Sequence, residues 1–276
     1  MAVKNCDTMI VNDMRPFLVR YKDGRFVRLL NSPFVPSSDA AGEAGLATRD
    51  VVIDPATGVS VRLFRPVDAV ITRGNSKNKL PLVIYYHGGA FCSGSAFAKV
   101  FHRYASSLCA DAGAVVVSVE YRLAPEHPIP AVYDDGWVAL KWAASLADPW
   151  LAEYADPERM FLVGESAGGN IVHNMAARAA ATRDCQDISI EGIVLLQPYF
   201  WGTERLPSEM DRDDGPLFGS EWADTVWPFL TAGTAGNDDP RLNPPAEQVM
   251  SLSCQRALVA VASKDLLRDR GFQYAT

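Results

Sequence analysis

The sequence predicts an α/β fold with a doubly wound, mostly parallel sheet. From about residue 50 onward, short apolar runs alternate with helical stretches, which is typical of repeated β–α units. The runs are rich in Val, Ile and Leu on both faces, as strands covered by helices on both sides require. At 276 residues and 48% hydrophobic content, the chain can form one sizeable core.

The elements follow in order. Two early strands at 51–54 and 59–64 are expected to pair as a hairpin through Pro55–Gly58, and the polar stretch 72–79 is expected to be a loop. The other strands and helices are predicted from apolar runs and from the stretches between them. Buried strands are predicted at 81–87, 114–121, 159–165, 192–199 and 257–263, and helices at about 97–110, 131–147 and 166–182.

Two segments fall outside this alternation and are interpreted as lids. Residues 1–48 precede the first strand, and residues 200–250 are rich in Trp, Pro, Gly and Asp. The predicted organisation is therefore an N-terminal cap over 1–48 and a main domain over 49–276, with an insertion at 200–250. The aromatic residues of the insertion either line an apolar pocket or pack on the core. They are Phe200, Trp201, Phe218, Trp222, Trp227 and Phe229.

Composition excludes several classes of partner. The net charge is −7, and Lys and Arg are scattered, so a nucleic-acid partner is not expected. No apolar run approaches the roughly 20 residues that span a bilayer, and the start lacks a secretory signal pattern. Five widely spread cysteines without a CxxC pair indicate reduced thiols. We therefore expect a cytoplasmic protein without membrane partners. Its oligomeric state cannot be read from the sequence.

GESAGG, at residues 164–169, is a candidate nucleophile motif. Ser166 follows a predicted strand and opens a predicted helix, and Gly164 and Gly168 flank it in the G-x-S-x-G spacing. A tight strand-to-helix turn exposes the serine hydroxyl, and small neighbours permit that geometry. The helix N-terminus also favours developing negative charge. This context predicts a nucleophilic serine rather than a chance glycine-rich turn.

HGGAF, at residues 87–91, is a candidate oxyanion loop. Acyl transfer passes through a tetrahedral oxyanion, and fixed N–H donors stabilise it. Gly88 and Gly89 follow a buried strand and can turn their N–H groups toward that oxygen, and Ala167, after the nucleophile, supplies a third. His87 is interpreted as a side chain that braces the glycine loop rather than as a base.

A third motif, YRLAPEHPIPAVYDD at 121–135, completes a combination that resembles the hormone-sensitive-lipase-like branch of the α/β-hydrolases. More closely, the chain is similar to the plant carboxylesterase group, which also holds the gibberellin receptors and 2-hydroxyisoflavanone dehydratases. The resemblance runs from PFLVRYKDGRFVRLL (16–30), through DVVIDPATGVSVRLF, to SKDLLRDRG (263–271). Arg122 is expected to pair with Asp134 or Asp135, and His127 is expected to be structural.

The resemblance implies a Ser-Asp-His triad, in that order along the chain. Asp265, just after the last predicted strand, matches the family's acidic member, which orients the histidine and stabilises its charged form. Asp269 is the competing carboxylate and is expected to lie beside Arg268 or Arg270. No histidine occurs after His173, and neither His173 nor His102 is expected near Ser166. We interpret the sequence as shortened at its C-terminus, with the last strand and the histidine loop missing.

The resemblance therefore implies a serine carboxylesterase acting on small or medium acyl esters, without a metal or organic cofactor. Because the base is missing, activity of this form is in doubt, and the run 257–263 is expected to become an exposed sheet edge. Two alternatives stay open. One is a gibberellin-type receptor, which keeps the fold but lacks the histidine. The other is a dehydratase of the hydroxyisoflavanone type. The natural substrate cannot be read from the sequence.

Overall fold

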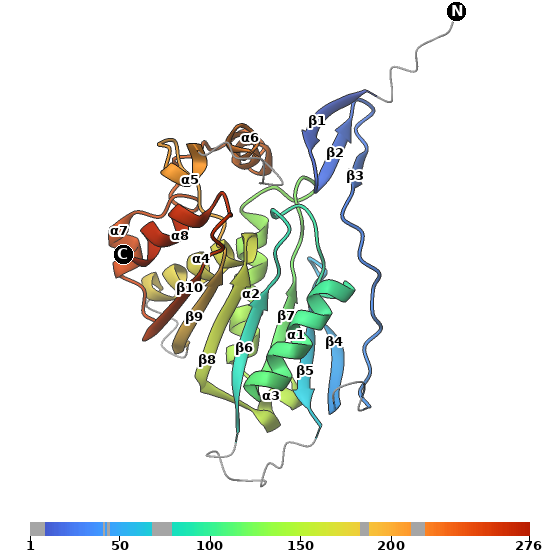
Figure 1. Cartoon of the computed structure of the whole chain (residues 1–276). Helices are drawn as coiled ribbons and strands as arrows, with labels where there is room; N and C mark the ends of the chain where they lie inside the picture. Colours follow the sequence, from blue (N-terminus) through green and yellow to red (C-terminus); the bar gives the residue numbers. More distant parts are fainter. Residues whose placement is uncertain (1–8, 41, 43–44, 68–78, 183–187, 211–218) are drawn as a thin grey trace, which may run out of the picture.

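The computed structural model describes residues 9–40, 42, 45–67, 79–182, 188–210 and 219–276. Its centre is a seven-stranded sheet with the strand order β10-β9-β8-β6-β7-β5-β4 (Figure 1). Strands β6 to β10 run parallel, and the antiparallel hairpin β4–β5 pairs with β7. The strands are β4 (Leu46–Asp54), β5 (Val59–Pro66), β6 (Leu80–Tyr86), β7 (Val115–Glu120), β8 (Ala155–Glu165), β9 (Ile190–Leu196) and β10 (Arg256–Ala260). The doubly wound sheet is confirmed.

Helices cover both faces of the sheet, and two apolar clusters fill the space beneath them. On one face, α1 packs over β5 and β7, with Ala105 and Cys109 buried against Val116 and Tyr85. On the other face, α4 packs over β8 and β9, and α2 packs against α4. The helices on these faces are α1 (Lys99–Ala112), α2 (Ala131–Ala144), α3 (Pro149–Tyr154) and α4 (Ala167–Ala181). The three predicted helices are therefore confirmed, and α3 was missed.

The edge of the sheet agrees with the expectation that the run 257–263 becomes an exposed edge. The apolar run by itself predicted a buried strand, but β10 is the edge strand, and most of its side chains are exposed. Leu258 is 58% exposed. The edge pairs only with β9, in parallel register from Arg256 opposite Gly192. An open edge of this kind leaves backbone donors and acceptors free to pair with another chain.

The N-terminal segment forms a small sheet of its own, which the sequence analysis did not predict. Strands β1 (Ile10–Met14), β2 (Leu18–Tyr21) and β3 (Phe26–Arg28) pair antiparallel in that order. Leu18 is fully buried. Figure 1 shows this sheet at the end of the main sheet where the loops after β6 and β7 lie. We refer to this small sheet, Ile10–Arg28, as the cap.

The described part of the segment 200–250 combines short helices with irregular stretches. It contains α5 (Pro207–Met210), α6 (Ser220–Leu230) and α7 (Ala246–Met250), and α8 (Arg268–Ala275) packs against α5. The Phe17 ring contacts Trp222 of α6 with centroids 5.7 Å apart, so the cap and the insertion meet. Phe200, Trp201 and Trp227 are buried. Packing on the core is therefore the main role of these three aromatic residues.

Some predicted features lie outside the described residues. These are the stretch 72–78 of the predicted loop, and Phe218 of the insertion. Within the described part of the chain, no helix combines the length and apolar character that crossing a bilayer requires.

Candidate active site

Ser166 lies at a sharp turn between β8 and α4. Its backbone φ of 51° is positive, a conformation that non-glycine residues adopt rarely and that marks strain at functional sites. Two hydrogen bonds hold the turn: the Ser166 N–H donates to Leu196 O at 2.8 Å, and Tyr199 N–H donates to Ser166 O at 2.9 Å. The neighbouring loop after β9 therefore fixes the serine in its strained geometry.

The two flanking glycines are required by close backbone packing. A Cβ on Gly164 would overlap the Gly168 carbonyl, and a Cβ on Gly168 would overlap the Tyr86 carbonyl oxygen. The first turn of α4 is thus pressed against the end of β6, where the HGGAF loop begins. This contact explains the G-x-S-x-G spacing physically and brings the two motifs together.

The HGGAF loop has three consecutive residues with positive φ. Gly89, Ala90 and Phe91 have φ values of 120°, 51° and 58°. A Cβ on Gly89 would overlap the Ser93 carbonyl, so this position also needs glycine. In the described residues, the N–H groups of Gly88 and Gly89 donate to no acceptor. Ala167 is the first residue of α4, where N–H groups have no acceptor within the helix.

His87 is fully buried behind this loop. Its Nδ1 lies 2.7 Å from Gly88 O, and because a carbonyl oxygen only accepts, Nδ1 carries the proton. The ring stacks on Tyr121, whose hydroxyl donates to His87 O at 2.7 Å. Burial lowers the pKa of His87 to about 4, so the imidazole is neutral at pH 7. These contacts agree with a bracing role.

Asp265 follows β10 and is half-buried. Its Oδ1 accepts a hydrogen bond from Leu267 N–H at 2.9 Å. Since β8 and β10 run parallel with β9 between them, Ser166 and Asp265 both follow strands that end at the same edge of the sheet. The competing Asp269 is engaged elsewhere: it pairs with Arg268 at 2.8 Å and accepts from Ser208 N–H at 2.8 Å. The Arg268 guanidinium lowers the pKa of Asp269.

The histidines have other partners or none. His173, buried in α4, has Nδ1 3.0 Å from the Tyr274 hydroxyl and Nε2 3.4 Å from Gln248 Oε1. The His102 ring lies 3.1 Å from Arg62 Nη1, and His127 is exposed. In the described part of the chain, the Ser166 hydroxyl has no hydrogen-bond partner.

An ion pair joins the segment after β7 to helix α2. The sequence left Asp134 and Asp135 open as partners of Arg122. The structure pairs Arg122 with Asp135, Nη2 to Oδ1 at 2.6 Å, and the Asp135 carboxylate is buried. Asp134 pairs instead with Arg178 at the surface. Asp135 also accepts from the Arg122 backbone N–H at 2.8 Å, which fixes the entry to the loop.

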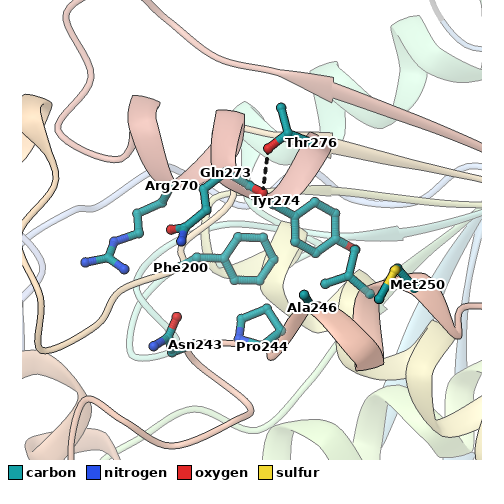
Figure 2. Close-up of a pocket in the computed structure, with 10 residues that line it drawn as sticks. Phe200, Asn243, Pro244, Ala246, Met250, Arg270, Gln273, Tyr274 and Thr276 are labelled. Carbon is teal, nitrogen blue, oxygen red and sulfur yellow. Dashed lines mark hydrogen bonds between the residues drawn. The ribbon is translucent and has the colours of Figure 1, made fainter.

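A pocket of about 180 Å³ lies beside the nucleophile helix (Figure 2). Its wall includes Phe200 and residues of α7 and α8, and Figure 2 shows the Phe200 ring beside Tyr274. The two rings stack with centroids 4.7 Å apart. Ser166 and the oxyanion-loop glycines do not line this pocket. Of the aromatic insertion residues, Phe200 therefore both packs on the core and lines a pocket.

Three residues near the site were not singled out from the sequence. Asn170 of α4 is buried and donates to Arg241 O at 2.8 Å, which ties the nucleophile helix to the insertion. The Glu165 carboxyl would lie 3.0 Å from a Cβ on Gly88, and burial raises its pKa. Arg28 of the cap bonds to the segment after HGGAF. Glu165 stands inside GESAGG, directly before Ser166, and this place in the motif was the signal in the sequence.

Comparison with known proteins agrees with this fold. A profile of the family described as alpha/beta hydrolase fold matches residues 83–276. The chain belongs to the α/β-hydrolase family.

Its relatives define the branch more closely. The chain is 41% identical over 280 residues to 2-hydroxyisoflavanone dehydratase from Glycyrrhiza echinata, covering 96% of this chain and 82% of that protein. It is 38% identical over 265 residues to probable carboxylesterase 2 from Arabidopsis thaliana, covering 95% and 81%. It is also 41% identical over 278 residues to the chloroplastic tuliposide A-converting enzyme 1 from Tulipa gesneriana, covering 97% and 67%. These relatives confirm the resemblance to the plant carboxylesterase group.

Solved structures give the same result. A hyperthermophilic esterase from the archaeon Pyrobaculum calidifontis superimposes with a TM-score of 0.67 at 28% identity, covering 89% of this chain and 70% of that one. A bacterial heroin esterase gives a TM-score of 0.69 at 27% identity, covering 84% and 70%. The chain is therefore carboxylesterase-like in fold and sequence.

Glu120, at the end of β7 behind the oxyanion loop, predicts a pH dependence of stability. Its carboxyl accepts from Ala96 N–H at 2.6 Å, and burial raises its pKa to about 7. The folded state favours the neutral form of the Glu120 carboxyl. Its contribution to the free energy of unfolding is therefore fully present below about pH 4.5 and is lost as the pH rises through about 7. We expect urea unfolding to show that the change in stability from pH 5 to pH 8 is less favourable in the wild type than in Glu120→Gln, because the buried His87 and His173, whose pKa values are lowered to about 4, contribute the opposite trend equally in both proteins.

Glu126→Gln is the matched control for that experiment. Arg28 lowers the pKa of Glu126, so the contribution of this carboxylate has the opposite sign and is lost as the pH falls. An equal pH trend in the wild type and in Glu120→Gln would contradict the assignment to Glu120.

Proposed function

We propose that the chain carries the acyl-transfer site of a serine carboxylesterase, with Ser166 as nucleophile. The observation that carries the proposal is the contact between the two motifs: Gly168, two residues after Ser166, packs against the carbonyl of Tyr86, directly before HGGAF. This places a strained serine beside a loop whose Gly88 and Gly89 N–H groups have no acceptor in the described residues. The carboxylesterase relatives support the same chemistry.

In this proposal, Ser166 Oγ attacks the ester carbonyl carbon while an imidazole base takes its proton, and the C=O electrons move onto oxygen. The N–H groups of Gly88, Gly89 and Ala167 stabilise that oxyanion. Collapse of this adduct breaks the ester C–O bond, the alcohol leaves with the proton, and water then hydrolyses the acyl-serine. Burial raises the pKa of the Glu165 carboxyl, which lies beside Gly88 of the oxyanion loop. Asp265 would orient an imidazole base. None of the four histidines of the described chain contacts Ser166, so this base is not supplied by the 276 residues.

The test supplies the base from solution. We expect the purified chain to hydrolyse p-nitrophenyl butyrate slowly, because an incomplete triad retains only ~10³- to 10⁴-fold catalysis over water. Added imidazole should raise the Ser166-dependent rate by about tenfold or more. Ser166→Ala is the matched control, since it reports the direct reaction of imidazole with the ester. The difference between the two progress curves is the measurement.

Two results would contradict parts of the proposal. Identical curves for the wild type and Ser166→Ala at every imidazole concentration would remove Ser166 as the nucleophile. Ser166-dependent turnover at ordinary esterase rates without imidazole would mean that the base is present after all.

A second candidate function rests on the similarity to 2-hydroxyisoflavanone dehydratase. A dehydratase would carry out β-elimination at the same site, with the N–H groups of Gly88, Gly89 and Ala167 holding the substrate carbonyl. Incubation with a p-nitrophenyl ester and with a 2-hydroxyisoflavanone, followed by product analysis, separates the two. Binding of gibberellin by calorimetry tests the receptor alternative. A cytoplasmic location and a small-molecule ester as partner remain proposals as well, in line with the free thiols of Cys92, Cys109 and Cys254.

A further inference from the structure

We propose that Arg28 is a positioning residue for the oxyanion loop, so that the N-terminal cap sets the geometry of the site it covers. Arg28 ends β3, and its guanidinium reaches out of the small sheet to the main domain. Nε donates to Cys92 O at 2.7 Å, and Nη2 donates to Ala124 O at 3.2 Å. Nη1 and Nη2 also donate to the two oxygens of the Glu126 carboxylate, at 3.0 and 2.7 Å.

The first acceptor directly follows the strained part of the loop. Ala90 and Phe91 adopt positive φ without being glycines, so their conformation must be imposed by contacts. The Cys92 and Ser93 N–H groups fold back onto Gly89 O at 3.1 and 2.9 Å. Because Arg28 donates to Cys92 O, it fixes the residue that directly follows the strained Ala90 and Phe91.

The second acceptor lies on the segment that supports the loop from outside. Ala124 N–H donates to Phe91 O at 3.0 Å, which links segment 121–130 to the oxyanion loop. Arg28 bonds to Ala124 O and to Cys92 O, on the two sides of this link. One guanidinium therefore binds both segments that this hydrogen bond joins. Its acceptors, Cys92 and Ala124, lie 64 and 96 residues after Arg28 in the sequence.

The geometry calls for arginine rather than for positive charge alone. A planar fork can donate to a carboxylate with two nitrogens while reaching two carbonyls, and a lysine ammonium cannot reproduce this arrangement. The side chain is 30% exposed, so its removal does not open a core cavity. The Phe17–Trp222 contact also holds the cap independently of Arg28. We therefore expect Arg28 variants to fold.

Amide hydrogen exchange tests the clamp without any substrate. Arg28→Ala should speed exchange at the Cys92, Ser93 and Ala124 amides by about tenfold or more, because local opening becomes easier. Arg28→Lys should behave like Arg28→Ala if fork geometry matters. Arg20→Ala is the matched control: Arg20 lies on the neighbouring strand of the same sheet, stacked over Phe26. It should leave these three amides unchanged.

The kinetic readout rests on the proposed function. The Ser166-dependent hydrolysis of p-nitrophenyl butyrate in imidazole should lose about 10- to 100-fold in kcat in Arg28→Ala, with KM nearly unchanged, since oxyanion donors act in the transition state. If the wild type shows no Ser166-dependent rate, the proposed function fails, and exchange alone decides on the clamp. Unchanged exchange in Arg28→Ala overturns the proposal. Faster exchange with unchanged kcat also overturns it, because Arg28 would then be structural only.

Discussion

Gly168→Ala is expected to lower the free energy of unfolding by about 3 kcal/mol or more, at the upper end for overpacking. The added methyl would overlap the Tyr86 carbonyl oxygen and lie 2.9 Å from His87 O. These are backbone atoms of β6 and the residue after it, and β6 is held between β7 and β8. The strain cannot be relieved by a side-chain rotation, so α4 must move away from the oxyanion loop. Ser166-dependent hydrolysis should be lost together with stability.

Urea unfolding followed by circular dichroism measures this effect. Gly219→Ala is a suitable control, because a Cβ at Gly219 meets no atom within 4 Å and the residue has an ordinary negative φ. Its midpoint should change little. A Gly168→Ala protein with the wild-type midpoint would show that α4 and β6 are not pressed together as described.

Glu209→Ala is expected to cost about 3–5 kcal/mol of stability, the range for breaking a buried ion pair. Glu209 pairs with Arg270 at 2.6 Å, and the two side chains are 0% and 5% exposed. The carboxylate also accepts from Leu206 N–H at 2.9 Å. Its loss leaves the Arg270 charge buried between α5 and α8, with only Glu204 O among the acceptors described for it. Because α8 begins three residues after Asp265, that carboxylate should lose its fixed position as well.

Asp134→Ala is the matched control for this pair. The Asp134–Arg178 bridge is exposed on both sides, so its removal should cost about 1 kcal/mol or less. The double variant Glu209→Leu with Arg270→Met should recover much of the loss, since it leaves no unpaired buried charge. Equal destabilisation by Glu209→Ala and Asp134→Ala, again by urea unfolding, would contradict this account of α5 and α8.

The parts of the fold that follow local rules could be predicted from the sequence. Apolar runs and glycine spacing predict the hairpin 51–64, the parallel strands and the helix after Ser166. The contact between GESAGG and HGGAF could be expected too, because the ends of neighbouring parallel strands meet at one edge. These features depend on residues close together in sequence or on strand order.

Other features depend on contacts that no local pattern encodes. Arg28 meets partners 64 and 96 residues away, so its role is invisible until the cap is placed. The composition of β10 resembles that of a central strand, and its exposure at the sheet edge was expected only because the family resemblance implies a neighbouring strand that this sequence lacks. Helix α6 was missed because Pro228 lies inside it. Which of Asp134 and Asp135 pairs with Arg122 likewise depends on how α2 packs in the fold.

The position of Phe91 has a consequence for how this protein can change. Its ring is held edge-on by Tyr133, Tyr199 and Trp227, at centroid distances of 6.4, 6.0 and 5.9 Å. These three residues come from α2, from the loop after β9 and from α6 in the insertion. Phe91 itself belongs to HGGAF and has a positive φ of 58°. Under the proposed function, substitutions that reshape the insertion are therefore expected to alter the reaction rate as well, and a change of selectivity is expected to need compensating changes around Phe91.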